Sequence, residues 1–153
     1  MPALIIRRGW RAGLLAVLLM SLATAAEGKP DTLVLHVTSI VRQKGVIDVT
    51  VYKNDRSFLS DTSWFLNTNV RLDSAKTKGF CDITVLLPKG EYAYVVFQDI
   101  NSNGNLDVNW IGYPNEPFAF SRQYRPLFRA PRFDEVSFRC KSSRDTITVI
   151  LGK

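Results

Sequence analysis

Apolar and polar residues alternate with a period of two in several short stretches of this chain. The five stretches with this alternation are 32–38, 47–52, 83–87, 136–138 and 146–151. Alternation of this kind is typical of β-strands that bury one face and expose the other. A turn at Arg42–Gly45 separates the first two stretches. We therefore predict that these two strands run antiparallel.

Residues Ala93–Phe97 are apolar on both faces, which predicts a central strand covered on two sides. The sequence Pro-Lys-Gly just before it, within Leu87–Tyr92, predicts a tight reversal. Residues 54–69 have no clean period and fit either a short helix or a loop pinned to the core, and a short strand is expected near Val70–Leu72. About seven short strands without a long amphipathic helix predict an all-β fold. We expect an antiparallel β-sandwich of the immunoglobulin-like or prealbumin-like kind.

Residues 1–26 have the pattern of a secretory signal peptide. Three arginines precede an apolar run from Ala12 to Met20, and small residues allow cleavage before Ala26 or before Glu27. The run is shorter than the roughly 20 residues that span a membrane, although an uncleaved anchor is the alternative. We predict an exported protein, periplasmic or secreted, with one domain at 27–153 and no membrane-spanning segment after cleavage.

Export changes how the net charge of +6 is interpreted. Removing the three arginines of the signal from the 20 basic residues leaves 17 against 14 acidic residues, a net charge of +3. Such a small excess, together with export, argues against nucleic acid as a partner. The remaining 127 of 153 residues are the usual size of one domain, and we expect a monomer.

The two cysteines, Cys81 and Cys140, would meet an oxidising compartment after export. A single pair in that setting predicts one disulfide bond, which would contribute about 4 kcal/mol in the chain-entropy model. The alternative is two separate buried thiols.

A polar run begins where the apolar strand ends. Its oxygen-bearing residues recur at every second position around Gly104, as in the first half of a calcium loop. The predicted calcium ligands are Asp99, Asn101, Asn103, the carbonyl group of Asn105, and Asp107. Trp110 occupies the position of the usual bidentate glutamate, so Glu116 could complete the site only if the chain folds back. Two carboxylates predict weak binding, with a dissociation constant of roughly 0.1 to 1 mM.

The same spacing has a second interpretation. Asp and Asn side chains accept hydrogen bonds from nearby backbone N–H groups and tolerate left-handed turns. The dipeptide Asn103-Gly104 is itself a turn signal. The run is therefore either a calcium site or a self-bonded turn.

The segment Trp110–Phe133 interleaves aromatic residues with arginines. It is long for a loop, and such loops are often functional. From Arg122 to Lys153 there are eight basic and three acidic residues. Aromatic rings beside guanidinium groups suit a cell-envelope glycan or an anionic polymer. The candidate ligand-binding residues are Trp110, Tyr113, Arg122, Arg125 and Arg129. Alternatively, the aromatic residues plug the end of the sandwich and the arginines are solvated or paired.

Catalysis has little support in the sequence. The only histidine, His36, alternates with apolar neighbours and is expected to face solvent, which leaves a serine nucleophile without a base and zinc without a histidine cluster. We expect a non-catalytic binding or structural module. The alternative is a cell-envelope hydrolase that uses carboxylates near the 110–133 segment.

Four motifs occur in a fixed order along the chain. They are Leu-Pro-Lys-Gly-Glu-Tyr-Ala from Leu87, Phe-Gln-Asp-Ile-Asn-Ser-Asn-Gly-Asn-Leu-Asp from Phe97, Gly-Tyr-Pro-Asn-Glu-Pro-Phe-Ala-Phe-Ser from Gly112 and Ala-Pro-Arg-Phe-Asp-Glu-Val-Ser-Phe from Ala130. With them the chain resembles the domain-of-unknown-function family 2141 over about Leu33–Leu151. The resemblance implies an exported β-sandwich and no established activity. The chain departs from the family pattern at Gln98, where a histidine is common, and at Ala119, where a glycine is common.

Overall fold

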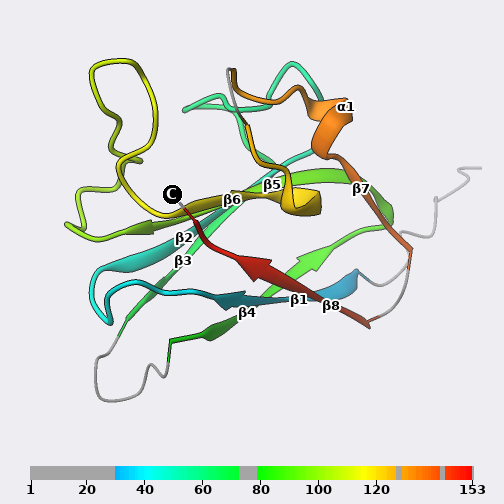
Figure 1. Cartoon of the computed structure of the whole chain (residues 1–153). Coiled ribbons are helices and arrows are strands. Elements are labelled where there is room, and N and C mark those ends of the chain that lie inside the picture. The colour runs from blue at the N-terminus through cyan, green and yellow to red at the C-terminus, as the bar shows by residue number, and fades with distance from the viewer. Residues whose placement is uncertain (1–29, 73–78, 127–128, 142–143, 153) are drawn as a thin grey trace, which may run out of the picture.

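The computed structural model describes residues 30–72, 79–126, 129–141 and 144–152. The predicted signal peptide lies outside these residues. The described chain forms eight strands, one short α-helix and one short 3-10 helix (Figure 1). These are β1 (Asp31–Thr38), β2 (Val46–Tyr52), β3 (Leu66–Arg71), β4 (Cys81–Leu87), β5 (Gly90–Asp99), β6 (Phe118–Phe120), η1 (Ser121–Gln123), α1 (Phe133–Val136), β7 (Phe138–Cys140) and β8 (Arg144–Ile150). Within them no helix is long and apolar enough to cross a membrane.

The strands form two facing sheets, so the predicted all-β sandwich is confirmed. One sheet has the order β4-β1-β8, and the other has the order β3-β2-β5-β6, with β7 also paired to β5. Figure 1 shows β1, β4 and β8 on one side and the larger sheet on the other. All pairs between these strands are antiparallel except β1 with β8, which is parallel.

The expectation that the first two strands pair with each other is wrong. β1 belongs to the three-stranded sheet and β2 to the five-stranded sheet, so the residues between them cross from one sheet to the other. Alternation predicts which face of a strand is buried but not which strand lies beside it. The inward residues of β1 and β2 meet in the same core. A hairpin within one sheet and an arch between two sheets both allow this arrangement.

Side chains from both sheets fill the space between them. The buried residues of this cluster include Leu33, Leu35, Val37, Ile47, Val49, Val51, Ile83, Val85, Leu87, Tyr92, Tyr94, Val96, Val149 and Leu151. They occupy every second position of their strands, as the alternation predicts. β5 is buried from Tyr92 to Asp99 and lies between β2 and the short strands β6 and β7, which confirms the prediction of a central strand.

A second apolar cluster covers the outer face of the five-stranded sheet. It contains Tyr52, Ala93, Val95, Phe97, Phe118, Phe120 and Val136, with Phe58, Leu106, Tyr124 and Phe133 packed against it. The residues between β2 and β3, which could have been a helix or a loop, form turns, and α1 lies on the same side of this sheet (Figure 1). This cover explains why the outward residues of β5 are apolar.

The predicted disulfide between Cys81 and Cys140 is wrong, because both cysteines are free. Cys81 begins β4, opposite Val37. The Cys140 thiol lies 3.9 Å from the Asp31 carboxylate, and Asp31 pairs with Leu87 at the other end of β4. Six residues of strand span about 20 Å, whereas the Cα atoms of a disulfide lie within about 7 Å.

Candidate functional site

The polar loop 99–107 begins at the last residue of β5. The Asp99 carboxylate is 3% exposed and accepts hydrogen bonds from the backbone N–H groups of Asn103 (3.1 Å) and Gly104 (2.8 Å). Asn103 N–H also donates to the side-chain oxygen of Asn101 at 3.1 Å. These bonds wind the loop around the Asp99 side chain, and the positive φ of 81° at Gly104 lets the chain turn there.

The carboxylate of Asp107 is the second centre of the loop. It accepts a hydrogen bond from the side-chain amide of Asn101 at 2.7 Å and another from the side-chain amide of Asn103 at 3.0 Å. The side-chain oxygen of Asn103 accepts in turn from the backbone N–H of Asn105 at 2.8 Å. Four of the five predicted calcium ligands, all except the Asn105 carbonyl, are thereby linked through their side chains. In this state the loop is bonded to itself.

The chain folds back onto the polar loop, and Glu116 binds both ends of the loop. This carboxylate is 5% exposed and accepts the backbone N–H of Ile100 at 2.7 Å and that of Asp107 at 3.2 Å. It therefore joins the two ends of the loop. Within the described residues, no group of three or more His, Cys, Asp or Glu side chains has the arrangement of a metal site. The asparagine side chains and the carbonyl oxygens of the loop are further oxygen donors beside its carboxylates.

The connection between β1 and β2 supports the loop from behind. The buried side chain of Gln98 donates to the carbonyl oxygens of Arg42 (2.5 Å) and Lys44 (3.2 Å) and accepts from Val41 N–H (3.1 Å). Gly45, at φ 87°, lies so close to Asp99 that an added Cβ would stand 2.1 Å from the Asp99 carbonyl oxygen. Gln98 thus holds a backbone turn.

The aromatic residues of the 110–133 segment divide between core and surface. Phe118 and Phe120 form β6 and are buried, whereas Trp110 is 95% exposed. A hollow of about 460 Å³, here called the loop groove, lies beside this segment. Its lining includes Leu59, Leu106, Val108, Ile111, Tyr113 and Arg129. Of the predicted ligand-binding residues, only Tyr113 and Arg129 line it.

The three predicted arginines do not converge. Arg125 donates to the carbonyl oxygens of Ile150 (2.9 Å) and Phe118 (3.4 Å), so it covers the outer edge of β8. Arg129 forms two hydrogen bonds with Glu135, at 2.8 and 2.6 Å, and this pairing lowers the pKa of Glu135 to about 2. Arg122 is exposed and has a φ of 59°.

A second hollow of about 420 Å³, here called the sheet groove, was missed by the sequence interpretation. Its floor is the outer face of β2, β3 and β5, and its walls come from the 53–65 turns and from the polar loop. The lining residues include Asp48, Thr50, Asn67, Asp61, Trp64 and Asn105. Leu59 and Leu106 line both grooves and separate them. No local motif marks this site, because its residues come from five parts of the chain: β2, the 53–65 turns, β3, β5 and the polar loop.

Asp48 is the carboxyl group with a perturbed pKa in the sheet groove. Burial raises the pKa of Asp48, the hydrogen bonds from Thr50 and Asn67 oppose that rise, and the charge of Asp99 adds to it. Burial also raises the pKa of Tyr52, with smaller contributions from the charges of Asp61 and Asp48. The polarity and negative charge of this groove distinguish it from the largely apolar loop groove.

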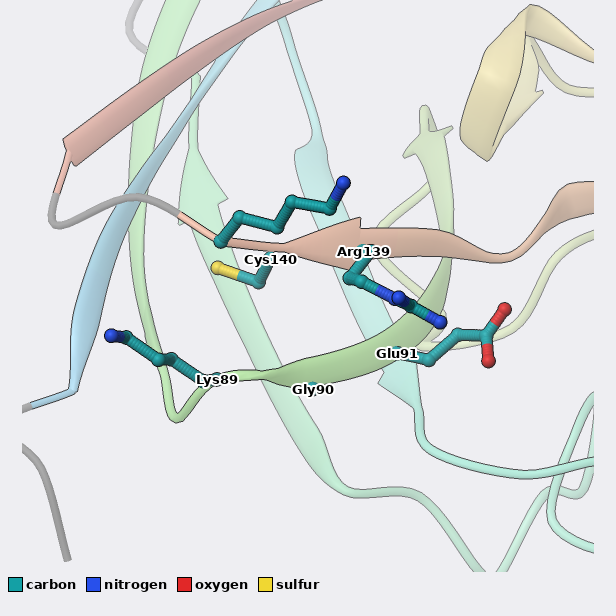
Figure 2. A pocket seen from close by; sticks show the side chains of 6 residues that line it. Lys89, Gly90, Glu91, Arg139 and Cys140 are labelled. Atoms are coloured by element: carbon teal, nitrogen blue, oxygen red, sulfur yellow. The ribbon is translucent and has the colours of Figure 1, made fainter.

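A third hollow, of about 500 Å³, lies at the start of β5 (Figure 2). Lys89 points away from Arg139 there, so these two cations do not face a common point.

Burial, followed by the charges of Asp31 and Asp145, raises the pKa of the Cys140 thiol. Burial likewise raises the pKa of Cys81 to about 11. Both thiols are therefore protonated at neutral pH and are weak nucleophiles.

His36 lies on the outer face of the three-stranded sheet, as expected. Its ring nitrogen Nδ1 is 2.5 Å from the carboxylate of Asp82, the residue opposite it on β4. Its ring also stacks at a tilt on Phe80, with centroids 5.1 Å apart. The histidine thus belongs to a cross-strand surface pair on the sheet opposite both grooves.

No curated protein and no solved structure matches the chain. A family model described as an uncharacterized protein conserved in bacteria, DUF2141, matches residues 35–148. The match covers most of the chain, from β1 into β8, and it includes the polar loop, Glu116 and the 110–133 segment. The chain therefore belongs to the DUF2141 family.

Proposed function

We propose that this chain is an exported, non-catalytic binding module whose polar loop takes up calcium with low affinity. The observation that carries this proposal is the convergence of Asp99, Asn101, Asn103 and Asp107 within one hydrogen-bonded loop. Calcium takes six to eight oxygen ligands from carboxylates, amide side chains and backbone carbonyl groups, and this loop offers all three kinds. Glu116 adds a third carboxylate at the base of the loop.

The same hydrogen bonds account for a low affinity. A calcium ion would replace the amide groups of Asn101 and Asn103 beside the Asp107 carboxylate. Those amides would then have to present their oxygens, which now accept backbone N–H groups, to the ion. The ion therefore competes with bonds that the loop already makes, and the dissociation constant is expected to be roughly 0.1 to 1 mM.

Thermal unfolding in chelator and in about 10 mM calcium tests the proposal. Calcium at ten times its dissociation constant adds about 1.4 kcal/mol to the free energy of unfolding. For a domain of this size the melting temperature should rise by about 5 °C. Calorimetric titration should give saturable heat with a stoichiometry of one.

The variant Asp107→Asn should abolish the calcium-dependent rise, because it removes a formal charge while keeping an oxygen at the same place. Asp145→Asn is the matched control, since it makes the same charge change on the exposed edge of β8. It should leave the rise intact. Identical melting curves in chelator and calcium, without heat of binding, would falsify the calcium proposal.

A second candidate function is the binding of a cell-envelope glycan or anionic polymer through the 110–133 segment. The observation in its favour is the exposure of Trp110 and Ile111 beside the loop groove. Retention of the protein on insoluble envelope glycan should fall in Trp110→Ala. Release of soluble sugar in the same assay would instead support the hydrolase.

A further inference from the structure

The sheet groove contains a prearranged set of polar groups. Asp48 and Thr50 are outward residues of β2, and Asn67 lies opposite Thr50 on β3. The Asp48 atom Oδ1 accepts from the Thr50 hydroxyl at 3.1 Å and from the Asn67 amide at 2.9 Å, and that amide also contacts the Thr50 oxygen at 2.8 Å. Both bonds go to Oδ1, and no hydrogen bond among the described residues reaches Oδ2. The carboxylate is thus held at one oxygen while the other is left for a ligand.

The charged residues that line the groove have one sign. Asp48 and Asp61 line it, and no Lys, Arg or His occurs among the described lining residues. Burial disfavours the charged form of Asp48, as its raised pKa indicates. No cation among the lining residues that the structure describes compensates this charge. A ligand that brings a positive charge would compensate it through a charge-assisted hydrogen bond.

Trp64 supplies an apolar surface at the rim of this groove. Its side chain is 48% exposed, although it lies in a segment that packs on the sheet. An exposed indole can cover the apolar face of a ring and attract a cation through its π system. Polar acceptors on the floor and a ring at the rim suit a ligand that has hydroxyl groups, a flat apolar face and an amine.

We infer that the sheet groove binds an amine-bearing sugar chain, with Asp48 and Asp61 contacting the amine and Trp64 covering a sugar ring. The hydroxyl groups of the sugar would be shared by Ser60 and Asn105 at the two walls. Asn105 belongs to both sites: its carbonyl oxygen is a predicted calcium ligand, whereas the sugar would contact its side chain in the groove. The sheet groove shares Leu59 and Leu106 with the loop groove, and these two residues lie between them.

Titration with a glucosamine tetramer tests this inference. Calorimetry should show saturable binding at neutral pH in the presence of chelator, so that the result does not depend on calcium. The N-acetylated tetramer should bind about tenfold more weakly, because it lacks the charge that strengthens the hydrogen bond to Asp48. A galacturonic acid tetramer should not bind. In an NMR spectrum, the indole signal of Trp64 should shift while that of Trp110 does not.

Three variants complete the test. Asp48→Asn and Trp64→Ala should each weaken binding of the glucosamine tetramer about tenfold or more, and Trp110→Ala should leave it unchanged. Asp48→Asn keeps both hydrogen bonds to Oδ1 and removes a charge that burial disfavours. It should therefore melt no lower than the wild type at pH 7, which excludes unfolding as the cause. Absence of binding, equal binding of the acetylated tetramer, or full binding by Asp48→Asn would each overturn the inference.

Discussion

The polar loop 99–107 and the segment 110–133 follow each other in the chain, yet their predicted site residues behave in opposite ways. In the polar loop, four of the five predicted residues use their side chains in one local network of hydrogen bonds, partly with each other and partly with backbone N–H groups. In the segment, Trp110 faces solvent, Arg125 lies on the edge of β8, and Arg129 pairs with Glu135.

The difference lies in the range of the interactions involved. An Asx side chain reaches backbone N–H groups only two to five residues away, so its spacing in the sequence decides its geometry. An arginine is long enough to reach partners on other elements, and those partners depend on the fold. Composition therefore suggested a cluster of cations that the tertiary structure distributes among separate partners.

The largest expected effect comes from the support behind the polar loop. In Gly45→Ala, the new Cβ would meet the Asp99 carbonyl oxygen at 2.1 Å and would force a positive φ on alanine. We expect a loss of about 3 kcal/mol in the free energy of unfolding, measured by urea denaturation.

Gly79→Ala is the matched control, because Gly79 also has a positive φ (81°) but has nothing within 4 Å of an added Cβ. It should cost only about 1 kcal/mol. Equal losses in the two variants would mean that the close approach of Gly45 to the polar loop does not matter.

The second effect concerns one residue from each of the two regions. Glu116→Ala leaves the backbone N–H groups of Ile100 and Asp107 without their buried acceptor. The cost should be about 2–3 kcal/mol in urea denaturation. Arg125→Ala, in the neighbouring segment, removes an exposed side chain that donates to two carbonyl groups and should cost about 1 kcal/mol. The reverse order of the two losses would contradict the contrast between the two regions.

The smallest effect is that of Arg129→Ala, and it depends on pH. The pKa of Glu135 falls from 4.5 in the unfolded chain to about 2, chiefly through the hydrogen bond from Arg129 and then through that from the Arg132 N–H group. The stability from this shift is present above pH 4.5 and is lost as the pH falls toward 2. Melting curves of the variant and the wild type should differ slightly at pH 7 and converge near pH 2. A difference that persists at pH 2 would indicate that Arg129 stabilises the fold by packing.

Sequence reasoning was most successful where interactions are local. Strands β1, β2, β4 and β8 lie close to the predicted stretches, and β5 is the expected central strand. Strand β6 was missed because Phe118–Phe120 is only three residues long within a segment interpreted as a loop. The pairing of β1 with β4 and β8, rather than with β2, depends on long-range contacts that alternation does not encode.

The candidate sites follow the same division. The spacing of residues in the polar loop was enough to predict which side chains lie together. The sequence interpretation named Glu116 only as a residue that could join the loop if the chain folded back. The sheet groove could not be predicted, since Asp48, Trp64 and Asn105 come from different segments and each is unremarkable in its local sequence. The prediction of a disulfide was wrong for the same reason. A count of cysteines carries no information about the length of β4, which separates Cys81 from Cys140.

The parallel pairing of β1 with β8 also has a kinetic consequence. Thr32 lies opposite Arg144, 112 positions later in the chain. The entropy of closing so long a loop is lost before the strand contacts repay it, and such pairings form slowly. A ribosome that still holds β8 therefore also delays completion of the three-stranded sheet. The sandwich can close only after that last strand has been released.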